Sequence, residues 1–246
     1  MFGSWFRKQP KSRKPKKRET KSAPLLAVGG EMVALSVRRS ARARRFVMRI
    51  NPSGEVCVTM PAHAALAEAL AFAREQAGWI TSQRARLPPP ARLAVGAMIP
   101  FLGLDHDIAL GTGPVRREGQ VIYVGGRPEH HARRITDFLR KTARDQLSTR
   151  AQELAAVLDV RVARITVRDT QSRWGSCSHA GALSFSWRLI LAPDFVRDYV
   201  VAHEVAHLKE MNHSPRFWAH VETLCPDRAR AQSWLKKHGR DLLRYS

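Results

Sequence analysis

Cysteine is scarce in this chain, and the few that occur are not arranged to form a set of disulfides. The chain has three cysteines in 246 residues, and Cys57, Cys177 and Cys225 are widely spaced. An odd and scattered set does not build the framework of a small disulfide-rich domain. The sequence therefore excludes that class and is consistent with a reducing cytoplasm, which is the location we expect.

Long hydrophobic runs are also absent. No stretch approaches the roughly 20 apolar residues that a membrane-spanning helix needs. The basic N-terminus precedes only a short apolar run at residues 24–28, which is too weak for a secretory signal. Because 44% of the residues are hydrophobic, the chain can still bury a full core. We expect a globular protein without a membrane span.

Acidic residues are few relative to basic ones. The chain has 42 Lys and Arg against 21 Asp and Glu, a formal net charge of +21. Nine Lys or Arg lie in the first 22 residues, and this composition predicts a basic disordered tail at residues 1–24. The positive field predicts non-specific contact with nucleic acid through the tail and the basic surface. No zinc finger, RNA-recognition signature or phosphate-binding loop accompanies it.

The most informative pattern that is present is H-E-V-A-H at residues 203–207, followed by His213. Residues four apart share one face of a helix, so His203 and His207 can reach the same ion. Neutral imidazole suits Zn²⁺, and a catalytic zinc site has three protein ligands and one open position. Glu204, beside the first histidine, can take a proton from the attacking water. The pattern is that of a metalloprotease.

Hydrophobic periodicity predicts the elements around this motif. Alternation of apolar and polar residues predicts strands, and apolar spacings of three and four predict helices. Strands are expected within 32–60, near 99–101 and 121–124, and at 163–167 and 183–189. Helices are expected at 62–86, at 135–158, from about 193 through the motif, at 215–224 and at 227–238, the last one ended by Gly239.

Three segments resemble the YgjP-like family of metal-dependent hydrolases, which is related to the SprT-like zincin metallopeptidases. They are V-R-D-T-Q-S-R-W-G-S-C-S at 167–178, L-A-P-D at 191–194 and Y-V-V-A-H-E-V-A-H-L-K-E-M-N-H-S-P-R-F-W at 199–218. The resemblance implies an α+β fold: a small zincin-type catalytic domain, with helices packed on a short sheet and H-E-x-x-H on the central helix. We expect this domain at 129–246, preceded by a β-rich N-terminal region at 25–128.

The resemblance also assigns the site. It implies that His203, His207 and His213 hold one Zn²⁺ per chain and that Glu204 is the general base. Another divalent ion, such as Mn²⁺ or Ni²⁺, is compatible with the same donors. On the residues alone, His220 and Glu222 rival His213 as third ligand. Both the spacing and the family favour His213.

Several nearby side chains are candidates for supporting roles. Arg173 and Trp174 are expected to bind substrate: Arg173 can hold a carboxylate or phosphate by a bidentate contact, and an adjoining edge strand can align an extended peptide. The alternative is that both only pack. Cys177 is a conceivable fourth ligand but more typical of a packed residue. Ser176 has no G-x-S-x-G frame and is a poor nucleophile. Tyr199 can bond a group behind the metal ligands or belong to the core.

The sequence thus predicts a zinc-dependent metallohydrolase acting on a peptide or protein substrate. Two alternatives stay open. One is a metal-dependent nucleotide phosphohydrolase, although such enzymes usually have carboxylate-rich Mg²⁺ sites. The other is a nucleic-acid-associated protein with a structural zinc, although structural sites usually have four closed ligands.

Overall fold

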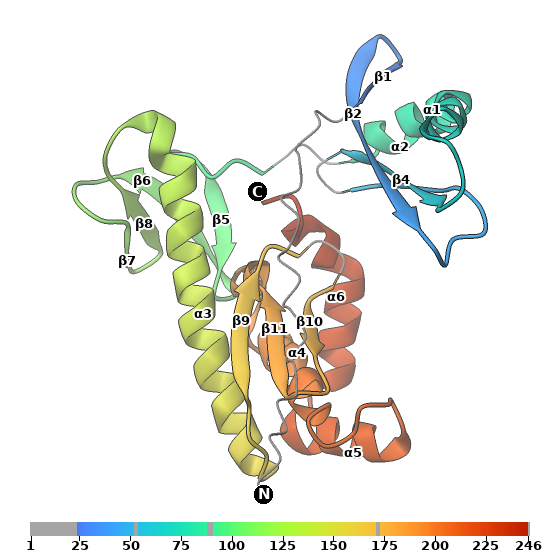
Figure 1. Ribbon diagram of the computed structural model, residues 1–246. Helices are drawn as coiled ribbons and strands as arrows, with labels where there is room; N and C mark the ends of the chain where they lie inside the picture. Colours follow the sequence, from blue (N-terminus) through green and yellow to red (C-terminus); the bar gives the residue numbers. More distant parts are fainter. Residues whose placement is uncertain (1–23, 52–53, 88–90, 171–172, 246) are drawn as a thin grey trace, which may run out of the picture.

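The computed structural model describes residues 24–51, 54–87, 91–170 and 173–245 (Figure 1). Of the predicted basic tail at 1–24, all but Pro24 lies outside these residues. The described chain combines helices with three small sheets, which confirms the predicted mixture of α and β structure. Within these residues, no helix is both long enough and apolar enough to cross a membrane.

The first sheet forms where apolar and polar residues alternate along the chain. Val56, Val58 and Met60 point to one side and are buried, as the period of two in a strand requires. The strand order is β1-β2-β4-β3, with β2 and β4 parallel and both outer pairs antiparallel. The strands are β1 (Leu25–Val28), β2 (Glu31–Ser40), β3 (Val47–Ile50) and β4 (Val56–Pro61).

Two helices pack on this sheet where the sequence predicted one at 62–86. They are α1 (Leu66–Glu75) and α2 (Ala77–Ala85). The helix is interrupted at Gln76, whose φ of −91° and ψ of 14° are not helical. The prediction of one helix was wrong because the apolar pattern continues across the break. Side chains of α1 and Ile80 of α2 enter the same buried cluster.

The second sheet reaches toward the helix that carries the motif. At its first turn Leu102 has a φ of 53°, and its backbone N–H donates to the Ile190 carbonyl at 2.9 Å. Gly103 has a φ of 81°, which favours glycine, and a Cβ there would lie 3.2 Å from Cα of Pro193, so a larger residue would strain this approach. The strand order is β5-β6-β8-β7. The strands are β5 (Met98–Phe101), β6 (Leu104–Leu110), β7 (Arg116–Glu118) and β8 (Val121–Val124).

The third sheet lies between two long helices, with α3 along one side and α6 along the other (Figure 1). Its order is β10-β11-β9, antiparallel between β10 and β11 and parallel between β11 and β9. The helix that carries the motif, α4, contacts α3, β10, α5 and α6. The strands are β9 (Arg164–Arg168), β10 (Gly175–Cys177) and β11 (Ala182–Ser186). The helices are η1 (Pro128–His130), α3 (His131–Val157), η2 (Trp187–Leu191), α4 (Asp194–Ala206), α5 (Pro215–Leu224) and α6 (Arg228–Leu242).

The described residues form two buried hydrophobic clusters. One contains only residues between Leu26 and Ile80, from the first sheet and its two helices. The other extends from Leu93 to Leu242 and joins the second sheet to the third sheet and the C-terminal helices. The predicted boundary between 25–128 and 129–246 stays a prediction, and the residues of β5 to β8 share their core with the C-terminal part.

Two predicted boundaries in the C-terminal part were wrong. The strand expected at 183–189 ends at Ser186 and becomes η2, because residues 187–191 are all buried and no face turns to solvent. The last helix does not stop at Gly239 but continues to Leu242. A Cβ at Gly239 would lie 3.2 Å from the ring of Trp174, so this glycine serves a close approach and does not end the helix.

Candidate metal centre

Helix α4 is fixed at its start by an arginine that is itself almost fully buried. Arg197 donates to the Ala192 carbonyl at 2.7 Å and to the Asp194 carboxylate at 2.5 Å. Asp194 lies in the first turn, where the helix dipole favours negative charge. Most residues of the helix are buried, and in its last turn Glu204 is buried and His203 is half-buried.

The helix ends directly after these residues. Its last helical residue is Ala206, and His207 is the C-cap with a φ of −63° and a ψ of −18°. The ring nitrogen Nδ1 of His207 lies 3.1 Å from the carbonyl oxygen of Glu210. When Nδ1 donates to this carbonyl, Nε2 keeps its lone pair free for a ligand bond.

A tight reversal then brings His213 back toward the helix. The side-chain oxygen of Asn212 accepts from the backbone N–H of Ser214 at 2.9 Å. The Ser214 hydroxyl accepts from the N–H of Phe217 at 3.3 Å and caps α5, and Pro215 occupies the first turn. His213 is therefore held between a local turn and a helix cap.

The three histidines predicted as ligands converge. Their potential ligand atoms lie within 4.8 Å of one another, and Nε2 of His203 lies 3.2 Å from Nε2 of His213. Phe217 and Trp218 form an aromatic wall beside them: the rings of His207 and Phe217 have centroids 4.5 Å apart, and those of His213 and Trp218 stack at 5.7 Å.

The donor set fits a zinc ion. Two nitrogens bound tetrahedrally at about 2.0–2.1 Å from one ion lie about 3.4 Å apart, close to the separation between His203 and His213. Burial, together with the nearby His207 and His213, lowers the pKa of His203 to about 4. His203 is thus neutral at pH 7, as a metal ligand must be. The buried Nδ1 of His203 has no hydrogen-bond partner among the described residues. An ion bound at Nε2 would leave this Nδ1 without a partner.

The rival ligands lie elsewhere. Among the described residues, the cluster of potential metal ligands contains neither His220 nor Glu222, and Glu222 is paired with Arg228 at 2.6 Å. Cys177 is also outside it. Burial raises the pKa of the Cys177 thiol to about 11, with the charge of Glu204 acting in the same direction, so it is not the thiolate that binds metals.

Glu204 lies beside the histidines in a small cavity. Glu204 is 6% exposed. Burial raises its pKa and the charge of Arg173 opposes this, and the net result is a pKa of about 7. A carboxyl group with such a pKa can both accept and release a proton near neutrality. The cavity has a volume of about 220 Å³ and is lined by Trp174, Gly175, Tyr199, Val200, His203, Glu204 and Leu235.

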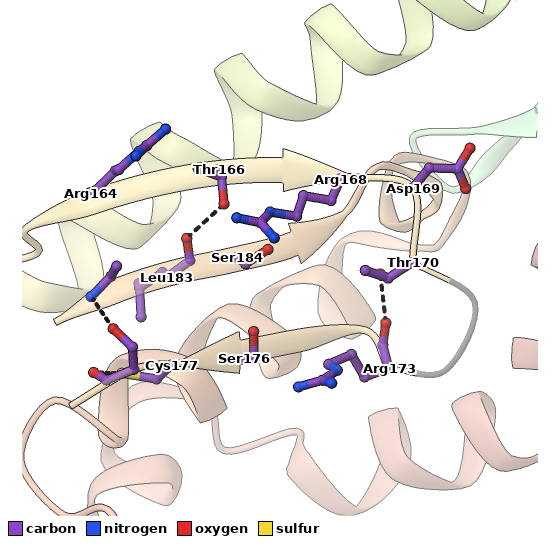
Figure 2. A pocket seen from close by; sticks show the side chains of 12 residues that line it. Arg164, Thr166, Arg168, Asp169, Thr170, Arg173, Ser176, Cys177, Leu183 and Ser184 are labelled. Atoms are coloured by element: carbon purple, nitrogen blue, oxygen red, sulfur yellow. Dashed lines mark hydrogen bonds between the residues drawn. The ribbon is translucent and has the colours of Figure 1, made fainter. Parts of the chain in front are cut away.

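The two residues predicted to bind substrate have different surroundings. Trp174 lines the cavity with Glu204. Arg173 lines a second hollow of about 670 Å³ on the open face of the third sheet. We call this hollow the arginine groove, and Figure 2 shows its side chains. It is formed chiefly by Arg164, Thr166, Arg168, Arg173, Ser176 and Ser184.

Two further candidates have ordinary structural contacts. Ser176 lines the arginine groove and is absent from the cavity that holds Glu204. The hydroxyl of Tyr199 accepts from the side-chain amide of Gln232 at 2.8 Å, and its ring meets that of His203 edge-on at 6.0 Å. Tyr199 thus supports the first histidine through packing.

Gly175 belongs to the site although no sequence pattern predicted it there. A Cβ on this residue would lie 2.5 Å from Oε1 of Glu204, so the carboxylate rests directly on the backbone of β10. The only signal was the G of R-W-G-S, and a lone glycine is too common to identify such a contact. For the turn at Asn212–Ser214, the sequence predicted only that a helix starts after it, at residue 215.

Comparison with known proteins gives one family match. The family described as "YgjP-like, metallopeptidase domain" matches residues 44–238. Among solved structures, the metallopeptidase zymogen of Pyrococcus abyssi abylysin is similar at 21% sequence identity with a TM-score of 0.34. That similarity covers 37% of this chain and 93% of the abylysin chain. No curated protein matches the chain.

Proposed function

The chain belongs to the YgjP-like family of metallopeptidase domains, and from that premise we propose that it is a zinc-dependent peptidase with Glu204 as its general base. One observation carries the proposal. Three imidazoles from separate turns of the chain bring their potential ligand atoms within 4.8 Å of one another. The buried carboxylate of Glu204 lines the same cavity as His203.

The ligand assignment follows from this geometry. His203, His207 and His213 would hold the ion, and the small number of protein ligands leaves room for substrate. When bound, zinc supplies Lewis acidity, which polarises a carbonyl oxygen and makes water more acidic. The contact of His207 Nδ1 with the Glu210 carbonyl orients that ring toward the cluster.

Glu204 moves the proton. Its carboxylate oxygen accepts a proton from the attacking water and later donates it to the nitrogen of the leaving amine. The raised pKa, near 7, suits both halves of this cycle because the group is neither too weak a base nor too weak an acid. Gly175 keeps the carboxylate in place, since any side chain there would displace it.

The substrate would bind as an extended strand beside β10. Among the described residues β10 pairs with β11 alone, so its other edge has backbone groups available for a peptide. Trp174, which lines the cavity, would pack against a substrate side chain.

Peptide cleavage tests the proposal. Zinc-loaded wild type and the Glu204→Gln variant are incubated with an unbiased peptide library, and products are identified by mass spectrometry. We expect cleavage by wild type, a loss of roughly 10²–10⁴-fold in Glu204→Gln, and one zinc per chain in both proteins by atomic emission. Glu129→Gln, an exposed change of the same type, is the control and should cleave like wild type. Full activity in Glu204→Gln would refute the mechanism.

The arginine groove favours one second candidate, a metal-dependent nucleotide phosphohydrolase. Arg164, Arg168 and Arg173 could hold phosphates there. The three-histidine donor set argues against it, because phosphohydrolases usually bind Mg²⁺ through carboxylates. Release of phosphate from nucleoside triphosphates that depends on zinc and on Glu204, without peptide cleavage, would support this candidate. The structural-zinc alternative has no comparable observation, since the described cluster has three donors and a structural site usually has four.

A further inference from the structure

The arginine groove lies on the open face of the third sheet, opposite the face that packs into the core. Thr166, Ser184 and Ser176 are register partners across β9, β11 and β10, and they form a row of hydroxyl-bearing residues across the sheet (Figure 2). Because these side chains are short, they form the bottom of the groove and leave space above the sheet for a ligand. The longer side chains of Arg164 and Arg168 rise from the two ends of β9.

The groove is positively charged because Asp169, the one acid among the described residues that line it, is already paired. Asp169 accepts from Arg188 at 2.5 Å and from Arg140 at 2.7 Å. Arg164 and Arg168 have no ion pair with any described carboxylate, and both are exposed. Their charges are therefore available to a ligand.

Strand β10 and the residues before it separate the groove from the metal cavity. Ser176 and Arg173 line the groove, whereas Trp174 and Gly175 line the cavity that contains Glu204. Side chains of a β-strand alternate between the two faces of a sheet. A peptide that pairs with the free edge of β10 would accordingly place alternate side chains toward the groove and toward the metal cavity.

We propose that the arginine groove is a specificity subsite for acidic side chains of the peptide substrate, so that the enzyme prefers Asp or Glu at alternate positions near the cleaved bond. The inference rests on the proposed peptidase function and adds the substrate class. Guanidinium groups bind carboxylates bidentately, and the hydroxyl row supplies further donors.

The lining of the groove favours a peptide over nucleic acid. Proteins that bind single strands generally stack bases on aromatic side chains beside the basic residues. None of the described residues that line the groove is aromatic. The groove also adjoins, through Arg173 and Ser176, the strand edge where a peptide backbone would pair. Arg173 is therefore the guanidinium nearest to the carboxylates of such a peptide, and Arg164 and Arg168, on β9 at the far side of the sheet, add positive charge behind it.

Binding is measured separately from cleavage. Zinc-loaded, full-length Glu204→Gln protein is titrated with short fluorescein-labelled peptides that carry either Glu or Gln at every second position, and anisotropy is recorded. We expect the Glu peptide to bind on the order of tenfold more tightly, and this preference to weaken as salt rises. Adding Arg164→Gln, Arg168→Gln and Arg173→Gln should reduce the ratio to near one, while Lys at all three positions should retain most of it.

A matched control removes the same charge elsewhere. Arg117, Arg127 and Arg240 are exposed and lie outside the groove, so changing all three to Gln should leave the ratio as in the parent protein. Circular dichroism verifies that each variant is folded. A ratio near one in the parent, or a ratio that persists after loss of Arg164, Arg168 and Arg173, would overturn the proposal. It would also be overturned, in favour of nucleic acid, if the loss weakened binding of single-stranded DNA but not the peptide preference.

Cleavage of the Gln peptide by zinc-loaded wild type tests the underlying function separately. Cleavage without any preference for the Glu peptide would refute the acidic subsite and leave the peptidase intact. If neither peptide is cleaved although the Glu peptide binds preferentially, the proposed peptidase function is refuted. The groove would then bind acidic peptides, but not as substrates, and the inference would be refuted too.

Discussion

Gly175 and Glu204 are in direct van der Waals contact. A Cβ atom on Gly175 would lie 2.5 Å from both Cγ and Oε1 of Glu204 and 2.8 Å from its Cδ. Real Cβ atoms do not approach other heavy atoms so closely, so the carboxylate and the strand occupy this space together only because residue 175 is glycine. The edge strand β10 therefore determines where the proposed general base lies.

The first prediction concerns this contact. In Gly175→Ala the carboxylate of Glu204 must move, and a displacement of about 1 Å at a reacting group costs on the order of 10²-fold in kcat. Zinc binding should remain, because the three atoms nearest to the added Cβ all belong to Glu204 and none to a histidine. We would measure peptide cleavage and zinc content of the same preparation.

Gly78→Ala is the control for this substitution. Gly78 lies in α2, and a Cβ there would meet no heavy atom within 4 Å. Activity should be unchanged, and helix stability should rise by up to about 1 kcal/mol. Wild-type activity in Gly175→Ala would show that Glu204 tolerates displacement and that its position is not set by the strand.

Much of the fold is predictable because its signals are local. The three- and four-residue spacing of buried residues along α3 and the alternation in β4, β9 and β11 arise from the periods of helix and strand. The family match over residues 44–238 confirms the predicted resemblance. The short strand β10 was missed, because Gly175, Ser176 and Cys177 have no apolar alternation and the strand exists only through pairing with β11.

The site is less predictable from the sequence than the fold, because only part of it depends on local spacing. The spacing of His203 and His207 requires only helix geometry, whereas the approach of His213 depends on how the chain reverses at Asn212 and Ser214. The packing of Gly175 on Glu204 is tertiary and has no local signal. The contact of Gly239 with Trp174 is also tertiary. Gly239 lies within α6 and leaves room for the ring of Trp174, and it does not end the helix.

The second prediction concerns the third metal ligand. His213→Ala should lower zinc affinity by more than tenfold, since a catalytic site would retain two of its three protein ligands. His220→Ala should retain wild-type affinity, because His220 lies outside the cluster formed by the other three. Competition with a chromogenic chelator measures both. Loss of zinc in His220→Ala but not in His213→Ala would reverse the assignment.

The third prediction concerns the ion pair beneath the arginine groove. The side chain of Arg188 is 1% exposed and donates to Asp169 and to the carbonyl of Tyr245. Asp169→Asn leaves this buried guanidinium without its anion. We expect a loss of about 2–3 kcal/mol in the free energy of unfolding by urea, less than for a fully buried pair because Asp169 is 44% exposed. Asp145→Asn, which removes an exposed pair with Lys141, should cost less than about 0.5 kcal/mol.

The same pair predicts a pH dependence. Burial alone would raise the pKa of Asp169, but the hydrogen bond from Arg188 and the charges of Arg188 and Arg140 outweigh it, so the pKa is lowered. The contribution of the pair is therefore fully present above the pKa of Asp in the unfolded chain, about 3.9. It is lost as the pH falls through the lower folded value. The stability difference between wild type and Asp169→Asn should shrink over that acidic range, and a constant difference would show that the carboxylate charge is not its cause.

The last prediction links a helix cap to the metal site. Ser214 caps α5 through its hydroxyl, directly after His213. Ser214→Ala should lower the free energy of unfolding by about 1 kcal/mol. It should also weaken zinc binding by roughly tenfold, because the reversal that positions His213 becomes less ordered. Ser214→Asp retains a capping oxygen and places negative charge at the helix start, so it should restore both quantities. Urea unfolding of the metal-free proteins and chelator competition separate the two effects. Unchanged zinc affinity in a destabilised Ser214→Ala protein would mean that the stacking of His213 on Trp218 holds the ligand without the cap.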